Sequence, residues 1–425
     1  MSGWRISPPV RILIGLATGL VAGALLAGRP WGASLAMVAG PVGRLWLDAL
    51  TMTVVPLVFS LLAGGVMAAA MQAAGGRIVL RSLLWFAVLL LAACMLGAAS
   101  TLVTLDLFPL PAAARLLPEA AGPASTALSG LPGSGDWLAG IIPTNPIKAA
   151  AETAMVPVVV FALLFGLAAS RIDPALRGAV DRLVRALAET MLVIVGWVLL
   201  VAPIGVLALA FGVGQRLGGG AAGVLAHYVA VVIATAIVSI LFVYTVAILF
   251  GRIGPLAFAR AALPAQVIAV STQSSLACLP AMVEAAPGLR VAQSSAGVVL
   301  PLAVSLFRLT SAAVNVAVAL YLAEVHQVVP GPAAVAAGVI VAALVSIAAV
   351  GLPAQVSFFA IVAPVCLAMG VPVALLPLLL AIETLPDVFR TLGNVTADIA
   401  VMAIVGRRGG ADGGGEGVGG GNGPA

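Results

Sequence analysis

Charged residues are scarce in this chain: Asp, Glu, Lys and Arg together make up 8% of its 425 residues. A soluble domain carries about 25% of these residues. Hydrophobic residues make up 62% of the sequence, and the mean hydropathy is +1.21. No soluble fold of this size could bury so much apolar surface. The composition therefore excludes a soluble class and makes lipid the solvent for much of the chain.

Histidine and cysteine are also rare, which argues against several kinds of site. There are only two histidines, His227 and His326, so a histidine-based metal site is not expected. The three cysteines form no close pair and all lie in apolar segments. This favours buried thiols over a disulfide or metal framework. No nucleophile stands beside a base in a recognisable motif, so we expect neither an enzyme nor a cofactor.

The basic residues do not point to a nucleic-acid partner, although the formal net charge is +5. They are mostly isolated arginines in short loops rather than a patch. Near the N-terminus, Arg5 and Arg11 precede an apolar run from Ile12 to Ala27, as in a signal peptide. Arg29-Pro30 follows this run without a convincing cleavage site. We therefore interpret the run as a first, retained span.

Eight apolar stretches are each long enough to cross a hydrocarbon core about 30 Å thick at 1.5 Å per helical residue. They cover residues 10–28, 45–70, 82–104, 141–170, 186–213, 224–251, 293–322 and 374–405. Two further apolar stretches, about 257–288 and 335–370, are interrupted by Pro, Gly and Ser or Thr near their middles. Non-helical backbone at membrane depth is tolerated only inside protein or beside a water-filled cavity. We interpret these two stretches as re-entrant hairpins, which enter and leave the membrane on one side.

The distribution of arginines agrees with this count of spans. If both hairpins are re-entrant, one face of the membrane carries Arg5, Arg11, Arg77, Arg81, Arg171, Arg177, Arg182, Arg185, Arg252, Arg260, Arg290, Arg407 and Arg408. The opposite face carries Arg29, Arg115 and Arg216. Because loops rich in Lys and Arg face the cytoplasm, both termini are predicted to be cytoplasmic in a multi-pass protein of the inner (plasma) membrane. The first hairpin then enters from the inside and the second from the outside.

A hairpin followed by a long helix with ionisable residues occurs twice in the second half. The first hairpin carries Ser274 and Ser275 in a run of hydroxylated residues, and the second carries Gly351 and Pro353. This is the plan of an inverted repeat with a solute site near the midplane. Serine hydroxyls and free backbone N–H groups at a broken helix end suit an anion, so these four residues are candidate substrate-binding residues. The alternative is that the serines only allow close helix packing.

The last predicted span carries a stripe of polar residues at helical spacing. Its members are Glu383, Asp387, Arg390, Thr391, Asn394 and Asp398. Steps of three and four residues place them on one face of the helix. A charge at the centre of a bilayer costs at least about 2.5–3.5 kcal/mol, so several on one face indicate a functional site. The alternative is a structural salt-bridge cluster of Glu383 or Asp387 with Arg390.

The chemistry of the stripe suggests a role for each side chain. The planar guanidinium of Arg390 would bind a carboxylate of the solute, and Asp387 would accept an ammonium group. Asn394 would hold a second carboxylate through its amide donor. Asp398 would bind a coupling cation or a proton. The site would therefore take a small anionic solute, with Na⁺ or H⁺ as the coupling ion.

The motifs of the chain resemble those of the dicarboxylate/amino acid:cation symporter family, which includes the glutamate transporters. The second-span motif is Leu50-Thr-Met-Thr-Val-Val-Pro56-Leu-Val-Phe-Ser60, and Ile141-Ile-Pro-Thr-Asn-Pro146 and Ala202-Pro-Ile-Gly-Val206 resemble the fourth- and fifth-span motifs. The most specific match is Asp387-x-x-Arg390-Thr391-x-x-Asn394-Val-Thr-x-Asp398. In the family, these positions contact the amino group and the carboxylates of the substrate and a sodium ion.

The resemblance also implies an architecture. It is an all-α polytopic membrane fold with eight transmembrane helices, two re-entrant helical hairpins and inverted repeats, working as an elevator-type transporter in a homotrimer. Residues 1–78 would belong to the scaffold, 79–105 to the transport domain, 106–213 to an external loop and the scaffold, and 214–406 to the transport domain. Residues 407–425 read as a disordered glycine-rich tail.

The seventh predicted span departs from the family pattern. Where the family carries Asn-Met-Asp-Gly-Thr, this chain has Phe307-Arg308-Leu309-Thr310-Ser311, aligned on Leu300-Pro301-Leu302. The amide and the carboxylate that bind sodium in the family are missing, and a permanent cation is present. We hypothesise that Arg308 takes the place of sodium and neutralises Asp398, so that sodium coupling is altered or absent. The alternative is that Arg308 faces a lipid headgroup or another helix.

Several substrates and mechanisms remain open at this stage. Arg390 favours an acidic solute, and Asp387 favours an amino acid over a plain C4-dicarboxylate, so aspartate or glutamate comes first. An organic anion exchanger or a C4-dicarboxylate transporter is the alternative. A passive anion channel or a non-transporting sensor is less favoured, because a channel needs a continuous polar path and the polar residues here cluster at one depth.

Overall fold

The computed structural model describes residues 8–73, 76–120, 142–348 and 354–412, and these ranges contain helices and no strands. The helices of the first half are α1 (Pro8–Leu25), α2 (Pro30–Thr51), α3 (Val54–Ala73), α4 (Arg77–Leu107), η1 (Ala112–Leu116), α5 (Leu117–Ala120), α6 (Pro146–Ala151), α7 (Met155–Ala169), α8 (Pro174–Leu200) and α9 (Ala202–Leu217). Those of the second half are α10 (Gly220–Leu249), α11 (Pro255–Thr272), α12 (Leu279–Glu284), η2 (Pro287–Leu289), α13 (Gln293–Leu306), α14 (Leu309–Val325), α15 (Pro332–Ala348), α16 (Ala354–Ala368), α17 (Leu376–Leu380) and α18 (Thr384–Asp412).

The chain is a multi-pass membrane protein by the length and composition of its helices. Within the described ranges, six helical stretches are long and apolar enough to cross a membrane: Pro30–Gln72, Arg77–Leu107, Pro174–Leu200, Gly220–Leu249, Gln293–Val325 and Thr384–Gly406. The first and fourth predicted spans correspond to α1 and α7, which are shorter, as is α9 in the fifth predicted span. The number of eight full spans therefore stays a prediction.

Several predicted boundaries differ from the structure. The fifth predicted span, 186–213, is divided between α8 and α9, because Pro203, the second residue of α9, has no backbone N–H with which to continue the hydrogen bonds of α8. The second predicted span, 45–70, begins much earlier, at Pro30 of α2. At the C-terminus, α18 continues to Asp412, past residue 407, where the tail was predicted to begin.

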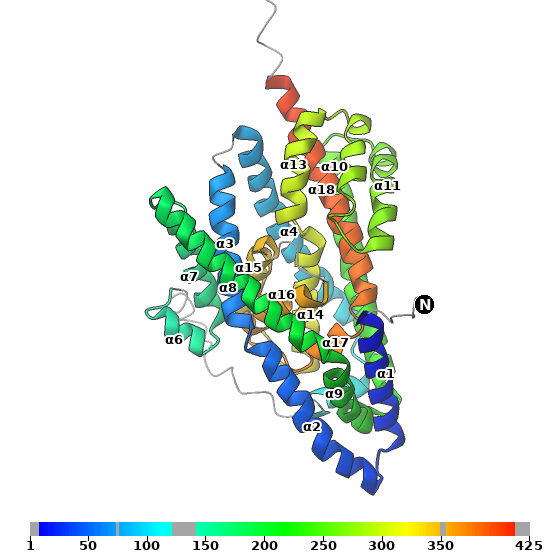
Figure 1. Cartoon of the computed structure of the whole chain (residues 1–425). Helices are drawn as coiled ribbons and strands as arrows, with labels where there is room; N and C mark the ends of the chain where they lie inside the picture. The colour runs from blue at the N-terminus through cyan, green and yellow to red at the C-terminus, as the bar shows by residue number, and fades with distance from the viewer. Residues whose placement is uncertain (1–7, 74–75, 121–141, 349–353, 413–425) are drawn as a thin grey trace, which may run out of the picture.

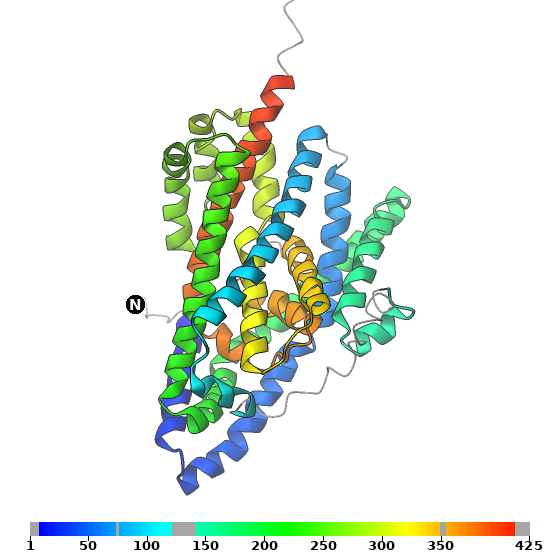
Figure 2. The same ribbon diagram turned by 180° about the vertical axis from the view of Figure 1, so that it is seen from behind.

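The two hairpins are connected to opposite ends of the α13–α14 segment. Helices α11 and α12 lie beside the C-terminal half of α18, at the end where α10 finishes and α13 begins (Figure 1). Helices α15 and α16 pack against each other and follow the opposite end of α14 (Figure 2). The second hairpin tip, with Gly351 and Pro353, lies outside the described residues. The arrangement agrees with two hairpins that enter from opposite faces.

Helix α18 is central and α8 is peripheral. Within an apolar stretch of 18 residues in each helix, 83% of the residues are buried in α18 and 22% in α8. Helix α18 packs on α10, α11, α13 and α14. Its polar stripe therefore faces other helices of the same chain rather than lipid.

Helices α1 and α9 pack with their backbones in close contact (Figure 1). Gly15, Gly19 and Gly23 recur at four-residue intervals on α1, and each faces a backbone carbonyl of α9. A Cβ on Gly19 would lie 2.5 Å from the Leu207 carbonyl oxygen. This small-residue stripe is a common way to bring membrane helices together, because glycine allows close backbone approach.

Replacing Gly19 by alanine should separate this helix pair. Overpacking of this kind costs about 1–3 kcal/mol, so the detergent-purified variant should melt at a lower temperature than the wild type. Gly40→Ala is the matched control, since a Cβ on Gly40 of α2 would meet nothing within 4 Å. That control should melt at or slightly above the wild-type temperature, because alanine favours helix over glycine. Equal melting of the two variants would argue against backbone contact at Gly19.

Candidate substrate-binding site

A polar cavity lies where the stripe of α18 meets both hairpins. It has a volume of about 60 Å³, enough for a few water molecules. Five parts of the chain line it: the α11–α12 tip, the α13–α14 break with the start of α14, helix α16, Glu383 just before α18, and α18 itself. The lining residues are Gln273, Arg308, Ser311, Asn315, Phe358, Ile361, Glu383, Asp387, Arg390, Thr391 and Asn394. Five members of the stripe, Glu383, Arg390, Thr391, Asn394 and Asp398, are at most 5% exposed.

Arg390 is held by partners from two helices. Its Nε lies 2.6 Å from Glu383 Oε1, an ion-pair contact without hydrogen-bond alignment. Its Nη1 donates to Asn315 Oδ1 at 2.6 Å and to the Ser311 carbonyl oxygen at 3.3 Å. Its Nη2 is buried and has no hydrogen-bond partner among the described residues. The Phe358 ring lies 5.9 Å from the guanidinium carbon, within the range of a cation–π contact.

Glu383 is the acidic counterpart of Arg390. The Tyr228 hydroxyl of α10 donates to Glu383 Oε2 at 3.3 Å. The structural salt bridge considered for this stripe is therefore present between Glu383 and Arg390. It leaves the Arg390 Nη2 donor unused, however, and an unused buried donor costs about 1–3 kcal/mol or more for a charged group. A carboxylate in the cavity would satisfy that donor.

Asn394 caps the N-terminus of α14 from the neighbouring helix. Its Oδ1 accepts hydrogen bonds from Thr310 N at 3.0 Å and from Ser311 N at 3.1 Å. Its Nδ2 donates to Ser311 Oγ at 2.8 Å. These backbone N–H groups are among the first of a helix, which have no partner within the helix itself. Most of the hydrogen-bonding capacity of Asn394 is therefore used inside the protein.

Arg308 lies at the break between α13 and α14 and lines the cavity. It therefore lies beside the polar stripe of α18, and its proposed replacement of sodium stays a prediction. The carboxylates of Asp387 and Asp398 both interact with it electrostatically. No ion pair within 4.0 Å joins Arg308 to an acid in the part of the chain that the structure describes. Arg308 is half-buried, and its guanidinium makes no side-chain hydrogen bond within the described ranges.

Asp398 lies one turn beyond Asn394 on α18 and is 1% exposed. Neither of its carboxylate oxygens has a hydrogen-bond partner among the described residues. A buried carboxylate in this condition needs a counter-charge or a proton. A single carboxylate fits a monovalent cation or a proton, and the described residues contain no cluster of three His, Cys, Asp or Glu for a metal ion.

Comparison with known proteins agrees with this arrangement. Residues 9–408 match the sodium:dicarboxylate symporter family. The chain belongs to this family. It is 25% identical to C4-dicarboxylate transport protein 1 of Pseudomonas aeruginosa over 404 residues, which cover 94% of this chain and 87% of that protein. It is 33% identical to the proton/glutamate-aspartate symporter of Bacillus subtilis over 211 residues, 48% of each chain. The corresponding symporter of Escherichia coli is 26% identical over 227 residues, 49% of each chain.

In this member of the sodium:dicarboxylate symporter family, the predicted hairpin residues that the structure describes do not line the cavity. Ser274 and Ser275 lie at the α11–α12 tip but are not among the lining residues, whereas the preceding Gln273 is. Gln273 adopts a left-handed conformation with φ of 52°, which ends α11 and starts the turn. Gly351 and Pro353 lie outside the described residues. The roles proposed for these four residues stay predictions.

Several residues that line the polar cavity, and one that contacts its lining, were not predicted. Asn315 and Ser311 follow Arg308 at helical spacing on α14, so the repeat of polar residues at 308, 311 and 315 was a usable signal. Phe358 and Ile361 of α16 had no such signal, because nothing distinguishes them from other apolar residues. Tyr228 lies 155 residues before Glu383, and only the fold brings the two together.

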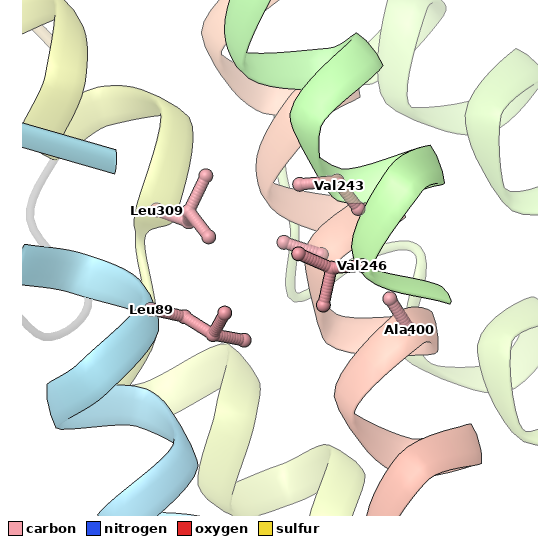
Figure 3. Close-up of a pocket in the computed structure, with 6 residues that line it drawn as sticks. Leu89, Val243, Val246, Leu309 and Ala400 are labelled. Carbon is pink, nitrogen blue, oxygen red and sulfur yellow. The ribbon is translucent and has the colours of Figure 1, made fainter. Parts of the chain in front are cut away.

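An apolar crevice elsewhere in the protein has no polar group to bind an anion. It lies between α4 and α14 on one side and α10 and α18 on the other (Figure 3). Leu89 and Leu309 face Val243, Val246 and Ala400 across it. Its lining offers no polar side chain. The polar cavity at Arg390 is therefore the better candidate for solute binding.

Proposed function

We propose that the protein is a secondary active transporter of a small dicarboxylate or acidic amino acid across the cytoplasmic membrane. The observation that carries this proposal is the unused Nη2 donor of Arg390, buried in a cavity to which both hairpins contribute. The relatives named as C4-dicarboxylate and glutamate-aspartate transporters support the same class of solute. Glu383, which pairs with Arg390, holds the place that a carboxylate of the solute would take.

In the proposed site, a carboxylate of the solute replaces the Glu383 carboxylate as the partner of Arg390. A solute carboxylate would bind the guanidinium of Arg390 with two parallel hydrogen bonds, the strongest geometry available to arginine. The Thr391 hydroxyl lines the same cavity and can donate to the solute. Phe358 of α16 covers the guanidinium, so the second hairpin would have to move before a solute enters.

The larger assembly is proposed on the same grounds. Residues 79–105 and 214–406 would form the mobile transport domain, and residues 1–78 and 106–213 the scaffold of a homotrimer. The central position of α18 and the peripheral position of α8 support this division. The arginine-rich loops support an inner-membrane protein with both termini in the cytoplasm.

Coupling to sodium is proposed to be altered or absent. The support is the loss of the family's amide and carboxylate in the α13–α14 break and the presence of Arg308, which interacts with Asp398. Exchange of one organic anion for another is the second candidate function. It is favoured because the positive charge of Arg308 is part of the protein. Unlike a bound ion, it cannot cross with the solute and drive net uptake.

Uptake into proteoliposomes tests these proposals together. Radiolabelled succinate and aspartate are offered with an inward sodium gradient, with a proton gradient, and with neither. We expect uptake of at least one solute, at similar rates with sodium and with a choline replacement. Protein-free liposomes are the control. A strong sodium requirement would refute the proposed coupling, and the absence of uptake, binding and exchange of both solutes would refute the proposed function.

A further inference from the structure

The second carboxylate of a solute has no obvious partner on α18. Asn394 is the residue expected to hold it, but the Asn394 Oδ1 caps two backbone N–H groups of α14. Its Nδ2 already donates to Ser311 Oγ, which leaves one N–H at most. Asn394 can therefore offer a carboxylate one N–H at most and no positive charge. A second carboxylate needs a further donor to be held as firmly as the first is by Arg390.

Arg308 is a group of the right chemistry in the right place. It lines the same cavity as Arg390 and comes from a different segment, the α13–α14 break. No acid within 4.0 Å pairs with it among the residues that the structure describes. Its positive charge is permanent, and its planar fork matches a carboxylate.

Arg308 also changes what Asp387 can do. The two side chains line one cavity and interact electrostatically. An ammonium group that approached Asp387 would also approach the guanidinium of Arg308, and like charges in a poorly solvated cavity repel strongly. Asp387 thus faces two guanidinium groups, Arg390 first and Arg308 second, and is not a free acceptor for an amino group.

We infer that Arg308 and Arg390 form a pair of guanidinium anchors, one for each carboxylate of a dicarboxylate that carries no ammonium group. This inference rests on the proposed function and narrows its substrate class. It makes Arg308 a specificity-determining residue. Aspartate and glutamate bind weakly to such a site, because their amino group meets Arg308.

The test compares binding of succinate, monomethyl succinate and aspartate to the detergent-purified protein by calorimetry. The wild type should bind succinate more tightly than either of the others. Arg308→Met should bind succinate about tenfold to a hundredfold more weakly, as expected for removal of one member of a buried charge pair. Its affinity for monomethyl succinate should not change, because the ester lacks the second carboxylate. Arg308→Lys should keep part of the preference, since it keeps the charge.

The matched control is Arg216→Met, which removes an exposed arginine at the end of α9. It should bind all three compounds as the wild type does. Equal losses for succinate and its ester in Arg308→Met would mean a structural role and overturn the inference. Tighter binding of aspartate than of succinate by the wild type would overturn it without any variant. If the folded wild type bound none of the three, the proposed function itself would fail.

Discussion

Replacing Arg390 by methionine should weaken solute binding at least about thirtyfold, the effect of losing a buried charged partner worth about 2–5 kcal/mol. Arg390 presents its unused Nη2 to the cavity and is the only arginine of the α18 stripe. Without the Arg390 guanidinium, the solute carboxylate would be repelled by the carboxylates of Glu383 and Asp387, which line the same cavity. Calorimetry with succinate and aspartate measures the loss.

The single substitution has a complication that a second variant removes. Deleting one partner of a buried ion pair costs about 3–5 kcal/mol, because the other charge stays buried. Glu383→Gln combined with Arg390→Met removes both charges of the pair and should remain folded. Arg260→Met, at an exposed position of α11, is the control. Wild-type affinity in a folded double variant would show that Arg390 does not bind the solute.

Changing Asp398 to asparagine should abolish accumulation of solute against a gradient while leaving exchange intact. The side chain is buried, and its two oxygens have no hydrogen-bond partner among the described residues. A buried carboxylate is costly unless it is paired or protonated. We expect Asp398 to take up a proton or cation together with the solute, in addition to its interaction with Arg308. The amide keeps the shape but carries no charge. Proteoliposomes then show labelled solute entering in exchange for internal unlabelled solute, with no net accumulation.

Glu324→Gln is the control for this change, because Glu324 is exposed at the end of α14. It should accumulate solute as the wild type does. Gradient-driven accumulation by Asp398→Asn at the wild-type level would assign the coupling charge to another residue. Loss of both accumulation and exchange would instead indicate that Asp398 is needed for the structure of the site.

The long helices could be predicted from hydropathy, and their breaks only in part. Helices α4 and α10 lie within a few residues of the predicted spans, because both are continuous apolar runs. Helix α2 was predicted too short: Gly32, Gly40, Pro41 and Arg44 lower the hydropathy of its first half. The structure continues the helix through Pro41, since the bilayer strongly favours helical backbone and neighbouring groups can satisfy what a proline frees.

The candidate site could be predicted where its residues share one helix. Helical spacing alone placed Asp387, Arg390, Thr391 and Asn394 on one face, and all four line the cavity. Spacing along α18 could not show that Asn394 caps α14, because that contact joins residues 84 positions apart. Cross-helix hydrogen bonds depend on how the helices pack, which one sequence does not state.

The close contact of α1 and α9 has a consequence for how the chain is made. The glycine face of α1 enters the membrane about 180 residues before α9 leaves the ribosome, an interval of roughly 10–35 s at ordinary rates of synthesis. During that time, the glycine face must be shielded by lipid or by the insertion machinery. The pairing of α1 with α9 is therefore a late event of biogenesis, because α9 has not yet been synthesised when α1 is inserted into the bilayer.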